Sequence, residues 1–349
     1  MTITHSRPSV DEVEMNGLQN VLASGQLAQG PQVQTFEKKL GSFHGFPHGV
    51  ATSSGTAALH LALLSLGVGP GDEVLLPSYV CSAPLHAVYH SGATPVLVDV
   101  DPTTGNMEPD DLKKRLTSKS KAIIAVHLFG LPADMDDILA LGLPVIEDCA
   151  QSLGANLGGR MLGTLGAISI CSFYATKLIT TGEGGMLLAR DPGLLARARD
   201  RRDYDKRDSF AIRFNYKMTD LQAALGRSQF QKLERFLAQR EALAGVYDEQ
   251  LATLPCALPL SQEGRIYYRY VVSIKGNITE LIQTLMNIGI EVARPVYRPL
   301  HRYFDLEDYP GAEMAWKSDL SLPIHPSLTS QDVHRVCQAL QQALTENSQ

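Results

Sequence analysis

The sequence predicts an α/β protein with a mainly parallel sheet that is covered by helices on both faces. Between residues 49 and 190, short aliphatic segments alternate with helical patterns, and this alternation is typical of α/β folds. The aliphatic segments are continuous instead of alternating with polar residues. Continuous segments of this kind indicate parallel strands that are buried on both faces.

Six candidate strands and two candidate helices make up this region. The strands are expected at residues 74–76, 95–98, 122–126, 144–146, 168–170 and 185–188. The helices are expected at residues 56–66 and 83–90. The first of these helices is apolar on nearly all sides, which predicts that it is buried.

The pattern changes after residue 219. Apolar residues recur at near-helical spacing as far as Tyr247, and Thr219 or Asp220 is a suitable N-cap for one long helix. A strand near 268–272, a helix over 279–287, a strand over 289–293 and a terminal helix through 333–344 follow. We therefore expect a large domain over residues 1–235 and a smaller C-terminal α+β domain over residues 236–349.

Composition and charge restrict the classes of partner. The chain has 349 residues, of which 44% are hydrophobic and 19% charged, as in a globular protein with a large core. Its net charge of −6 gives no basic surface for nucleic acid. No segment approaches the roughly 20 apolar residues that cross a bilayer, and the N-terminal residues do not resemble a signal peptide. We expect a cytoplasmic protein without a nucleic-acid or membrane partner.

The cysteines indicate neither a metal site nor a disulfide framework. There are five, at positions 81, 149, 171, 256 and 337, and no pair has CxxC spacing. A reducing compartment fits such a set, and we expect no metal.

An acid and a lysine form the first candidate site. Asp148 ends an aliphatic strand, at the sheet edge where α/β proteins bind ligands. Lys177 follows the next strand and precedes a glycine-rich turn. Alone, such an acid is more often a helix cap and such a lysine is more often a surface residue. Together they supply what pyridoxal 5′-phosphate (PLP) requires, an amine for a Schiff base and an acid that keeps the pyridine nitrogen protonated.

A candidate phosphate site precedes both residues in the chain. Ser54-Gly55-Thr56 stands at an expected strand-to-helix turn, where free backbone N–H groups and the helix dipole favour an anion. By itself the tripeptide is better explained as a helix N-cap. In order before Asp148 and Lys177, it completes a PLP site.

Further motifs occur over nearly the whole chain. They are SGTAAL from residue 54, GPGDEV from 69, GATPV from 92, HLFG from 127, EDCAQ from 147, SF from 172, GEGG from 182, NYKMT from 215 and PLH from 299. With these motifs the chain resembles the DegT/DnrJ/EryC1/StrS family of sugar aminotransferases, of fold type I. The resemblance implies a large PLP-binding domain with a mainly parallel mixed sheet and a smaller C-terminal domain.

The resemblance implies the catalytic roles. Lys177 would form the internal aldimine with PLP and, once displaced by substrate, carry the proton of the 1,3-shift. Asp148 would pair with the pyridinium nitrogen, and Gln151 would lie near the phenolic oxygen of the cofactor.

The resemblance also implies how the phosphate is bound. Gly55, Thr56 and Ser172 would hold it from one chain. Asn215 would reach the phosphate of the other subunit's cofactor, so that the active site would lie at a homodimer interface.

One position departs from the family pattern. Members often have an aromatic residue that stacks on the cofactor ring, and Cys81 stands at that position here. Either Cys81 covers the ring as a small apolar group or Tyr79 does so through a shifted backbone.

The candidate substrate contacts are Arg294, Tyr297 and His301. The Arg-Pro-Val-Tyr segment from 294 and the Pro-Leu-His segment from 299 resemble a variant found in nucleotide-sugar 4-aminotransferases. Arg294 and His301 each have a salt-bridged or capping role as the alternative. His127, at the end of a strand, either faces the site or is a buried, hydrogen-bonded histidine.

The predicted function is transfer of an amino group from L-glutamate to a nucleotide-linked 3- or 4-keto-deoxysugar. A PLP-binding regulator of the same fold is one alternative. A PLP-dependent sugar dehydratase is another, but family members of that kind usually have histidine in place of the Schiff-base lysine, and this chain keeps Lys177.

Overall fold

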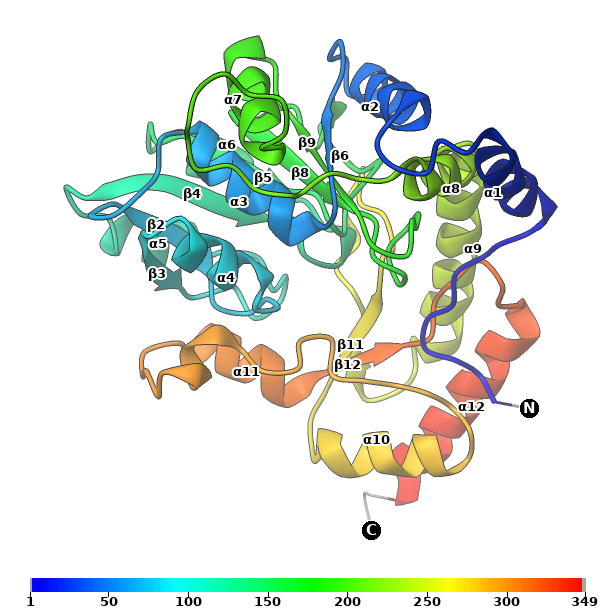
Figure 1. The fold of residues 1–349 in the computed structure, drawn as a ribbon. Coiled ribbons are helices and arrows are strands. Elements are labelled where there is room, and N and C mark those ends of the chain that lie inside the picture. Colours follow the sequence, from blue (N-terminus) through cyan, green and yellow to red (C-terminus); the bar gives the residue numbers. More distant parts are fainter. Residues whose placement is uncertain (1, 347–349) are drawn as a thin grey trace.

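The computed structural model describes residues 2–346 and has the expected α/β architecture (Figure 1). Within these residues the main sheet has seven strands in the order β1-β9-β8-β5-β4-β2-β3. They are β1 (Val50–Thr52), β2 (Glu73–Pro77), β3 (Thr94–Val98), β4 (Ser120–Val126), β5 (Val145–Asp148), β8 (Ile168–Ser172) and β9 (Gly185–Leu188). The strands from β3 to β8 in this order are parallel, whereas β9 pairs antiparallel with β8 and with β1. All six expected strands are present, and the prediction of a mainly parallel sheet is confirmed.

Helices pack on both faces of this sheet because successive side chains of a strand point to opposite faces. The bounds of the helices around the sheet are α1 (Glu12–Ser24), α2 (Pro31–Phe43), α3 (Gly55–Ser65), α4 (Ala83–His90), α5 (Pro109–Lys114), η1 (Leu128–Gly130), α6 (Met135–Leu139) and α7 (Pro192–Arg202). Ile124 of β4 lies in a core with α3, α4 and α7, whereas the adjacent Ile123 lies in a core with α5 and α6. A short hairpin joins β6 (Asn156–Leu157) to β7 (Arg160–Met161).

The long helix expected after residue 219 is two helices, α8 (Asp220–Phe230) and α9 (Leu233–Leu251). Thr219 is the N-cap of α8, and it forms a capping box with Gln222. The helical spacing of apolar residues continues across the turn at 231–232, so the periodicity did not signal the break. The second helix, α9, runs from the main sheet towards the smaller domain (Figure 1).

A second core, called the smaller domain, is built on an antiparallel sheet of β10 (Cys256–Ala257), β11 (Tyr270–Ile274) and β12 (Asp319–Leu322). The helices α10 (Ile278–Asn287) and α12 (Ser330–Glu346) pack in this core, whereas η2 (Leu300–Tyr303) and α11 (Pro310–Ser318) pack against the core of the main sheet. The strand expected over 289–293 is wrong. Its place is taken by two isolated bridges, Ile290 with Ile3 and Ala293 with Ser321.

The first described residues and α12 both pack in the core of the smaller domain (Figure 1). Ile3 is buried in its core, and the Ile3 N–H donates to the carbonyl of Gly289 at 2.9 Å. The N-terminal residues therefore reach this domain although the main sheet follows them in the sequence. Within residues 2–346, no helix combines the length and the hydrophobicity needed to cross a membrane.

Candidate active site

A cavity of about 350 Å³ lies at the carboxyl ends of β5 and β8 and is bordered by the N-terminus of α3. This is the sheet edge at which α/β proteins bind ligands. Among the described residues, seven of the predicted site residues line it: Gly55, Thr56, Cys81, Asp148, Gln151, Ser172 and Lys177. Segments separated by more than a hundred residues in the sequence thus meet in one place.

The acid of the cavity is Asp148, the last residue of β5, which is buried. Its Oδ1 accepts the N–H of Ala150 at 3.0 Å, and among residues 2–346 no hydrogen bond satisfies Oδ2. Burial raises the pKa of Asp148, and the Ala150 hydrogen bond and the charge of Lys177 act against this rise. A buried carboxylate with a free oxygen favours a cationic partner. The protonated ring nitrogen of PLP is such a partner, so Asp148 fits the cofactor.

The anion site of the cavity is the first turn of α3. Ser54 is the N-cap, and its hydroxyl accepts the N–H of Ala57 at 3.1 Å. The N–H groups of Gly55 and Thr56 belong to the first helical turn, where the helix offers no acceptor, and the helix dipole is positive there. A Cβ on Gly55 would lie 2.9 Å from the Cβ of Ser172. Glycine therefore allows the end of β8 and the start of α3 to approach closely enough for a shared phosphate site.

The amine of the cavity is Lys177, on the loop between β8 and β9. Its backbone N–H donates to the carbonyl of Tyr174 at 2.9 Å, and the next residues, Leu178 and Ile179, are buried in the core. The loop is therefore held on both sides of the lysine. The Nζ atom stands 4.9 Å from the centre of the Tyr268 ring.

Gln151 has one half of its amide engaged. Its Oε1 accepts the N–H of Phe129 at 2.9 Å. Phe129 has a φ of 56°, a left-handed conformation that is uncommon outside glycine, and the hydrogen bond helps to hold it. With the oxygen used, the amide N–H₂ of Gln151 is the group available to the cavity, and as a donor it suits a phenolic oxygen.

The two candidates for covering the cofactor ring have different surroundings. Cys81 is exposed and lines the cavity. Tyr79 is fully buried, and its hydroxyl donates to Oδ2 of Asp319 at 3.1 Å. Of the two, within the part of the chain that the structure describes, only Cys81 borders the cavity.

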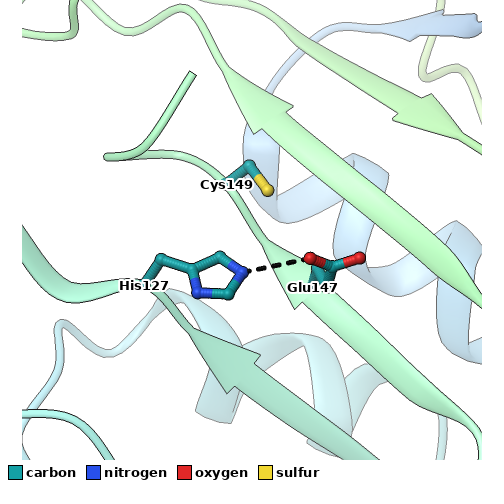
Figure 2. Close-up of side chains that lie close together, drawn as sticks. All are labelled: His127, Glu147 and Cys149. Atoms are coloured by element: carbon teal, nitrogen blue, oxygen red, sulfur yellow. Dashed lines mark hydrogen bonds and ion pairs between the residues drawn. The ribbon is translucent and has the colours of Figure 1, made fainter. Parts of the chain in front are cut away.

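Three buried side chains beside the cavity, His127, Glu147 and Cys149, lie within 4.8 Å of one another (Figure 2). His127 Nε2 lies 3.2 Å from Glu147 Oε2, and its Nδ1 accepts the N–H of Ala133 at 3.1 Å. The second of the two interpretations of His127, a buried and hydrogen-bonded histidine, is therefore the one the structure has.

Both carboxylate oxygens of Glu147 are also engaged in hydrogen bonds within the protein. Its two oxygens also accept backbone N–H groups at 2.6 to 2.8 Å, from Gly163, Leu165 and Gly166. Burial acts to raise the pKa of Glu147, but His127 and these N–H groups lower it overall. Burial raises the pKa of Cys149 well above its ordinary value, so its thiol stays protonated. The donors and acceptors are used within the protein, and the cluster is a hydrogen-bond network that fixes the end of β5 next to Asp148.

Arg294, Tyr297 and His301 are not among the described residues that line the cavity. The Arg294 guanidinium contacts the carbonyl of Trp316 and stands 4.2 Å from the centre of its ring. Tyr297 is 87% exposed. His301 is buried, with Nε2 2.9 Å from Glu313 Oε1. Within this chain, therefore, Arg294 and His301 make structural contacts.

Asn215 is also outside the cavity of its own chain. It is exposed, on the segment between α7 and α8. The next residue, Tyr216, accepts the N–H of Ser53 at 2.8 Å through its carbonyl, which places this segment beside the start of α3.

Tyr268 and Arg269 are among the cavity residues that sequence reasoning did not find. They come from the chain just before β11. Burial acts to raise the pKa of Tyr268, but Lys177 and Arg269 lower it to about 8. The only signal in the sequence was an arginine between aromatic residues at the start of the strand expected at 268–272, which a surface strand would also show.

Comparison with known proteins gives consistent matches over the whole chain. The profile of the DegT/DnrJ/EryC1/StrS aminotransferase family matches residues 8–341. A GDP-perosamine synthase of Caulobacter vibrioides is 40% identical over 337 residues, which cover 90% of this chain and 91% of that protein.

Solved structures of aminotransferases superimpose on nearly the whole chain. The aminotransferase TlmJ from Streptoalloteichus hindustanus superimposes with a TM-score of 0.94 at 33% identity, and the match covers 99% of this chain and 100% of that one. The PLP-form of a sugar aminotransferase from Streptococcus pneumoniae superimposes with a TM-score of 0.93 at 26% identity, with 99% of both chains covered.

Proposed function

This chain belongs to the DegT/DnrJ/EryC1/StrS aminotransferase family and is a PLP-dependent aminotransferase of fold type I, and we propose that it transfers an amino group from L-glutamate to a nucleotide-linked keto-sugar. One observation carries the proposal. A single cavity is lined by an amine, Lys177, by a buried acid, Asp148, and by the N-terminus of α3. The similarity to a GDP-perosamine synthase supports a nucleotide-linked substrate.

The chemistry of the site is divided between cofactor and protein. When bound, PLP supplies an aldehyde that exchanges amines and a ring that withdraws electrons from the reacting carbon. Lys177 provides the amine that holds the cofactor and, when released from it, accepts a proton at Nζ from the α-carbon of the donor. Asp148 keeps a proton on the ring nitrogen, because a buried carboxylate stabilises a cation beside it.

The remaining residues bind and orient. The N–H groups of Gly55 and Thr56 and the hydroxyl of Ser172 hold the cofactor phosphate. The amide of Gln151 donates to the phenolic oxygen. Ile170 and other apolar side chains that line the cavity limit the access of water to the reacting atoms.

The proposal includes a homodimer with shared active sites. Asn215 is exposed and lies outside its own cavity, so its amide is free to reach the phosphate of a partner's cofactor. The same segment exposes Tyr204 by 55%, Phe210 by 99% and Ile212 by 70%, and exposed apolar side chains of this kind favour contact with a second copy. Mixing Asn215→Ala subunits with Lys177→Ala subunits should restore one intact site per heterodimer. Absence of any rescue would count against the shared site.

The substrate is tested by offering GDP- and UDP-linked 3-keto and 4-keto sugars together with glutamate. An amino-sugar nucleotide, identified by mass spectrometry and NMR, is the expected product, and the NMR spectrum gives the aminated carbon. If only keto-cyclitols or free keto acids were aminated, the nucleotide-sugar assignment would be wrong.

A further inference from the structure

We propose that Arg269 binds the α-carboxylate of the amino-acid donor and that His5, near the N-terminus, holds the guanidinium in position. The inference rests on the proposed function, because it needs an amino-acid donor. It adds the residue that recognises that donor and gives the N-terminal segment a role in the active site.

Arg269 shares a cavity and an aromatic neighbour with the reacting amine. Both Arg269 and Lys177 line the cavity. The Cζ of Arg269 stands 5.2 Å, and the Nζ of Lys177 4.9 Å, from the centre of the same Tyr268 ring. Both cations contact one aromatic ring and border one cavity, so a single small ligand can reach the two of them.

The charge of Arg269 is not neutralised by the protein. Among residues 2–346, no carboxylate lies within ion-pair distance of its guanidinium, and the hydrogen bonds found for that group go to His5. Arg202, by contrast, has Glu37 at 2.5 Å, and Arg240, which also lacks an acid among the described residues, donates to three backbone carbonyls instead. A half-buried guanidinium without a counter-charge favours an anionic ligand.

His5 orients the guanidinium without cancelling its charge. Nη1 of Arg269 lies 3.1 Å from Nε2 and 3.3 Å from Nδ1 of His5. Burial and the charge of Arg269 lower the pKa of His5 to about 3, so the ring is neutral and accepts a hydrogen bond at ordinary pH. His5 is itself fixed, because its backbone N–H donates to Glu291 Oε2 at 3.1 Å and its Nε2 lies 2.9 Å from Ser321 Oγ.

The position of Arg269 distinguishes between the anions of the two substrates. In an α-amino acid, the carboxylate is attached to the carbon that carries the reacting amine. In a nucleotide sugar, the diphosphate is separated from the keto carbon by atoms of the sugar ring. An arginine that shares the cavity and the Tyr268 ring with the reacting amine therefore matches the donor, and its planar guanidinium can bind a carboxylate through two parallel hydrogen bonds.

The test separates the two half-reactions of the holoenzyme. For Arg269→Gln, the dissociation constant of glutamate, measured from the loss of the cofactor's visible absorbance at a series of concentrations, should rise between about 10-fold and 100-fold, as loss of a charge-assisted hydrogen bond predicts. Arg269→Lys should fall between the wild type and the glutamine variant. Calorimetric binding of glutarate, which has carboxylates but no amine to react, should weaken in parallel.

The controls show what the effect means. Arg265→Gln removes the same charge from an arginine that stands over Tyr267 and lines a different cavity, and it should leave glutamate affinity unchanged. The second half-reaction with the nucleotide sugar should keep its dissociation constant in Arg269→Gln. His5→Ala should weaken glutamate binding in the same direction by a smaller factor.

Several results would overturn the inference. Unchanged affinity for glutamate and glutarate in Arg269→Gln would remove the role of Arg269, and an equal loss for the nucleotide sugar would assign it to the diphosphate or to the shape of the cavity. Unchanged glutamate affinity in His5→Ala would remove the role of His5. A protein that reacts with glutamate but aminates no nucleotide sugar would refute the proposed acceptor and leave Arg269 standing.

Discussion

Asp148→Asn tests whether the acid of the cavity acts through its charge. The amide keeps an oxygen that can accept the N–H of Ala150, as Oδ1 of Asp148 does at 3.0 Å. The shape of the site is therefore retained, while the negative charge that would face the cofactor's ring nitrogen is lost. The change isolates one electrostatic contribution.

The size of the rate loss follows from the interaction between the Asp148 carboxylate and the protonated ring nitrogen of the cofactor. An opposite charge close by shifts the pKa of an ionisable group by about 1 to 3 units. The interaction between the two charges is therefore worth about 1.4 to 4 kcal/mol. The first half-reaction with glutamate should therefore slow by about 10-fold to 1,000-fold. Burial raises the pKa of Asp148, so the uncharged amide should not destabilise the fold.

Glu147→Gln, at the adjacent residue, is the matched control. The Glu147 oxygens accept hydrogen bonds from His127, Gly163, Leu165 and Gly166, and an amide would direct its own N–H₂ group at some of these donors. If two donors lose their acceptor at about 1 to 3 kcal/mol each, the free energy of unfolding falls by about 2 to 6 kcal/mol.

The two variants are compared by denaturant unfolding, by titration with PLP and by stopped-flow absorbance after mixing with glutamate. Asp148→Asn should lose rate and keep stability, whereas Glu147→Gln should lose stability and keep most of the rate in its folded fraction. A rate within threefold of wild type for Asp148→Asn would refute the electrostatic role of the acid.

Two further predictions concern the cofactor site. Gly55→Ala should weaken PLP binding by about 10-fold or more, because the new Cβ would lie 2.9 Å from Ser172 Cβ and push α3 away from β8; an unchanged dissociation constant in an absorbance titration would contradict the shared phosphate site. In the apoprotein, alkaline titration of tyrosinate absorbance should show one tyrosine with a pKa near 8, because Lys177 and Arg269 lower the pKa of Tyr268. Lys177→Ala removes a positive charge and should raise that pKa, whereas Tyr268→Phe should abolish the transition; a titration that neither variant alters would disprove the assignment.

Much of the large domain was predictable from the sequence for a physical reason. A parallel strand with both faces buried must be continuously aliphatic, so the segments around Ile123 and Ile146 were recognisable from composition alone. The same topology brings strand ends together. Asp148 was therefore placed at the ligand-binding edge from the sequence pattern, whereas Ser172 was placed there by the family resemblance, and both line the same cavity.

The remaining features depend on tertiary packing that leaves no local pattern. The break between α8 and α9 occurs within an uninterrupted helical spacing of apolar residues. The apolar segment over 289–293 satisfies its backbone through single bridges to Ile3 and Ser321, which the residues themselves do not distinguish from a strand. Arg269 reaches the cavity only because the smaller domain faces the sheet edge there, and His5 contacts it only because the N-terminal residues return to that domain.

The central claim is that Lys177 presents the amine through which glutamate and a keto-sugar nucleotide exchange an amino group. Its most direct test is the visible absorbance of the purified protein with PLP, followed during sequential addition of the two substrates. We predict a visible band that glutamate removes and that the nucleotide-linked keto-sugar restores, and a Lys177→Ala protein that remains folded but shows neither the band of the wild type nor the cycle. A wild-type band that glutamate and other amino acids leave unchanged, or a full cycle in Lys177→Ala, would contradict the account.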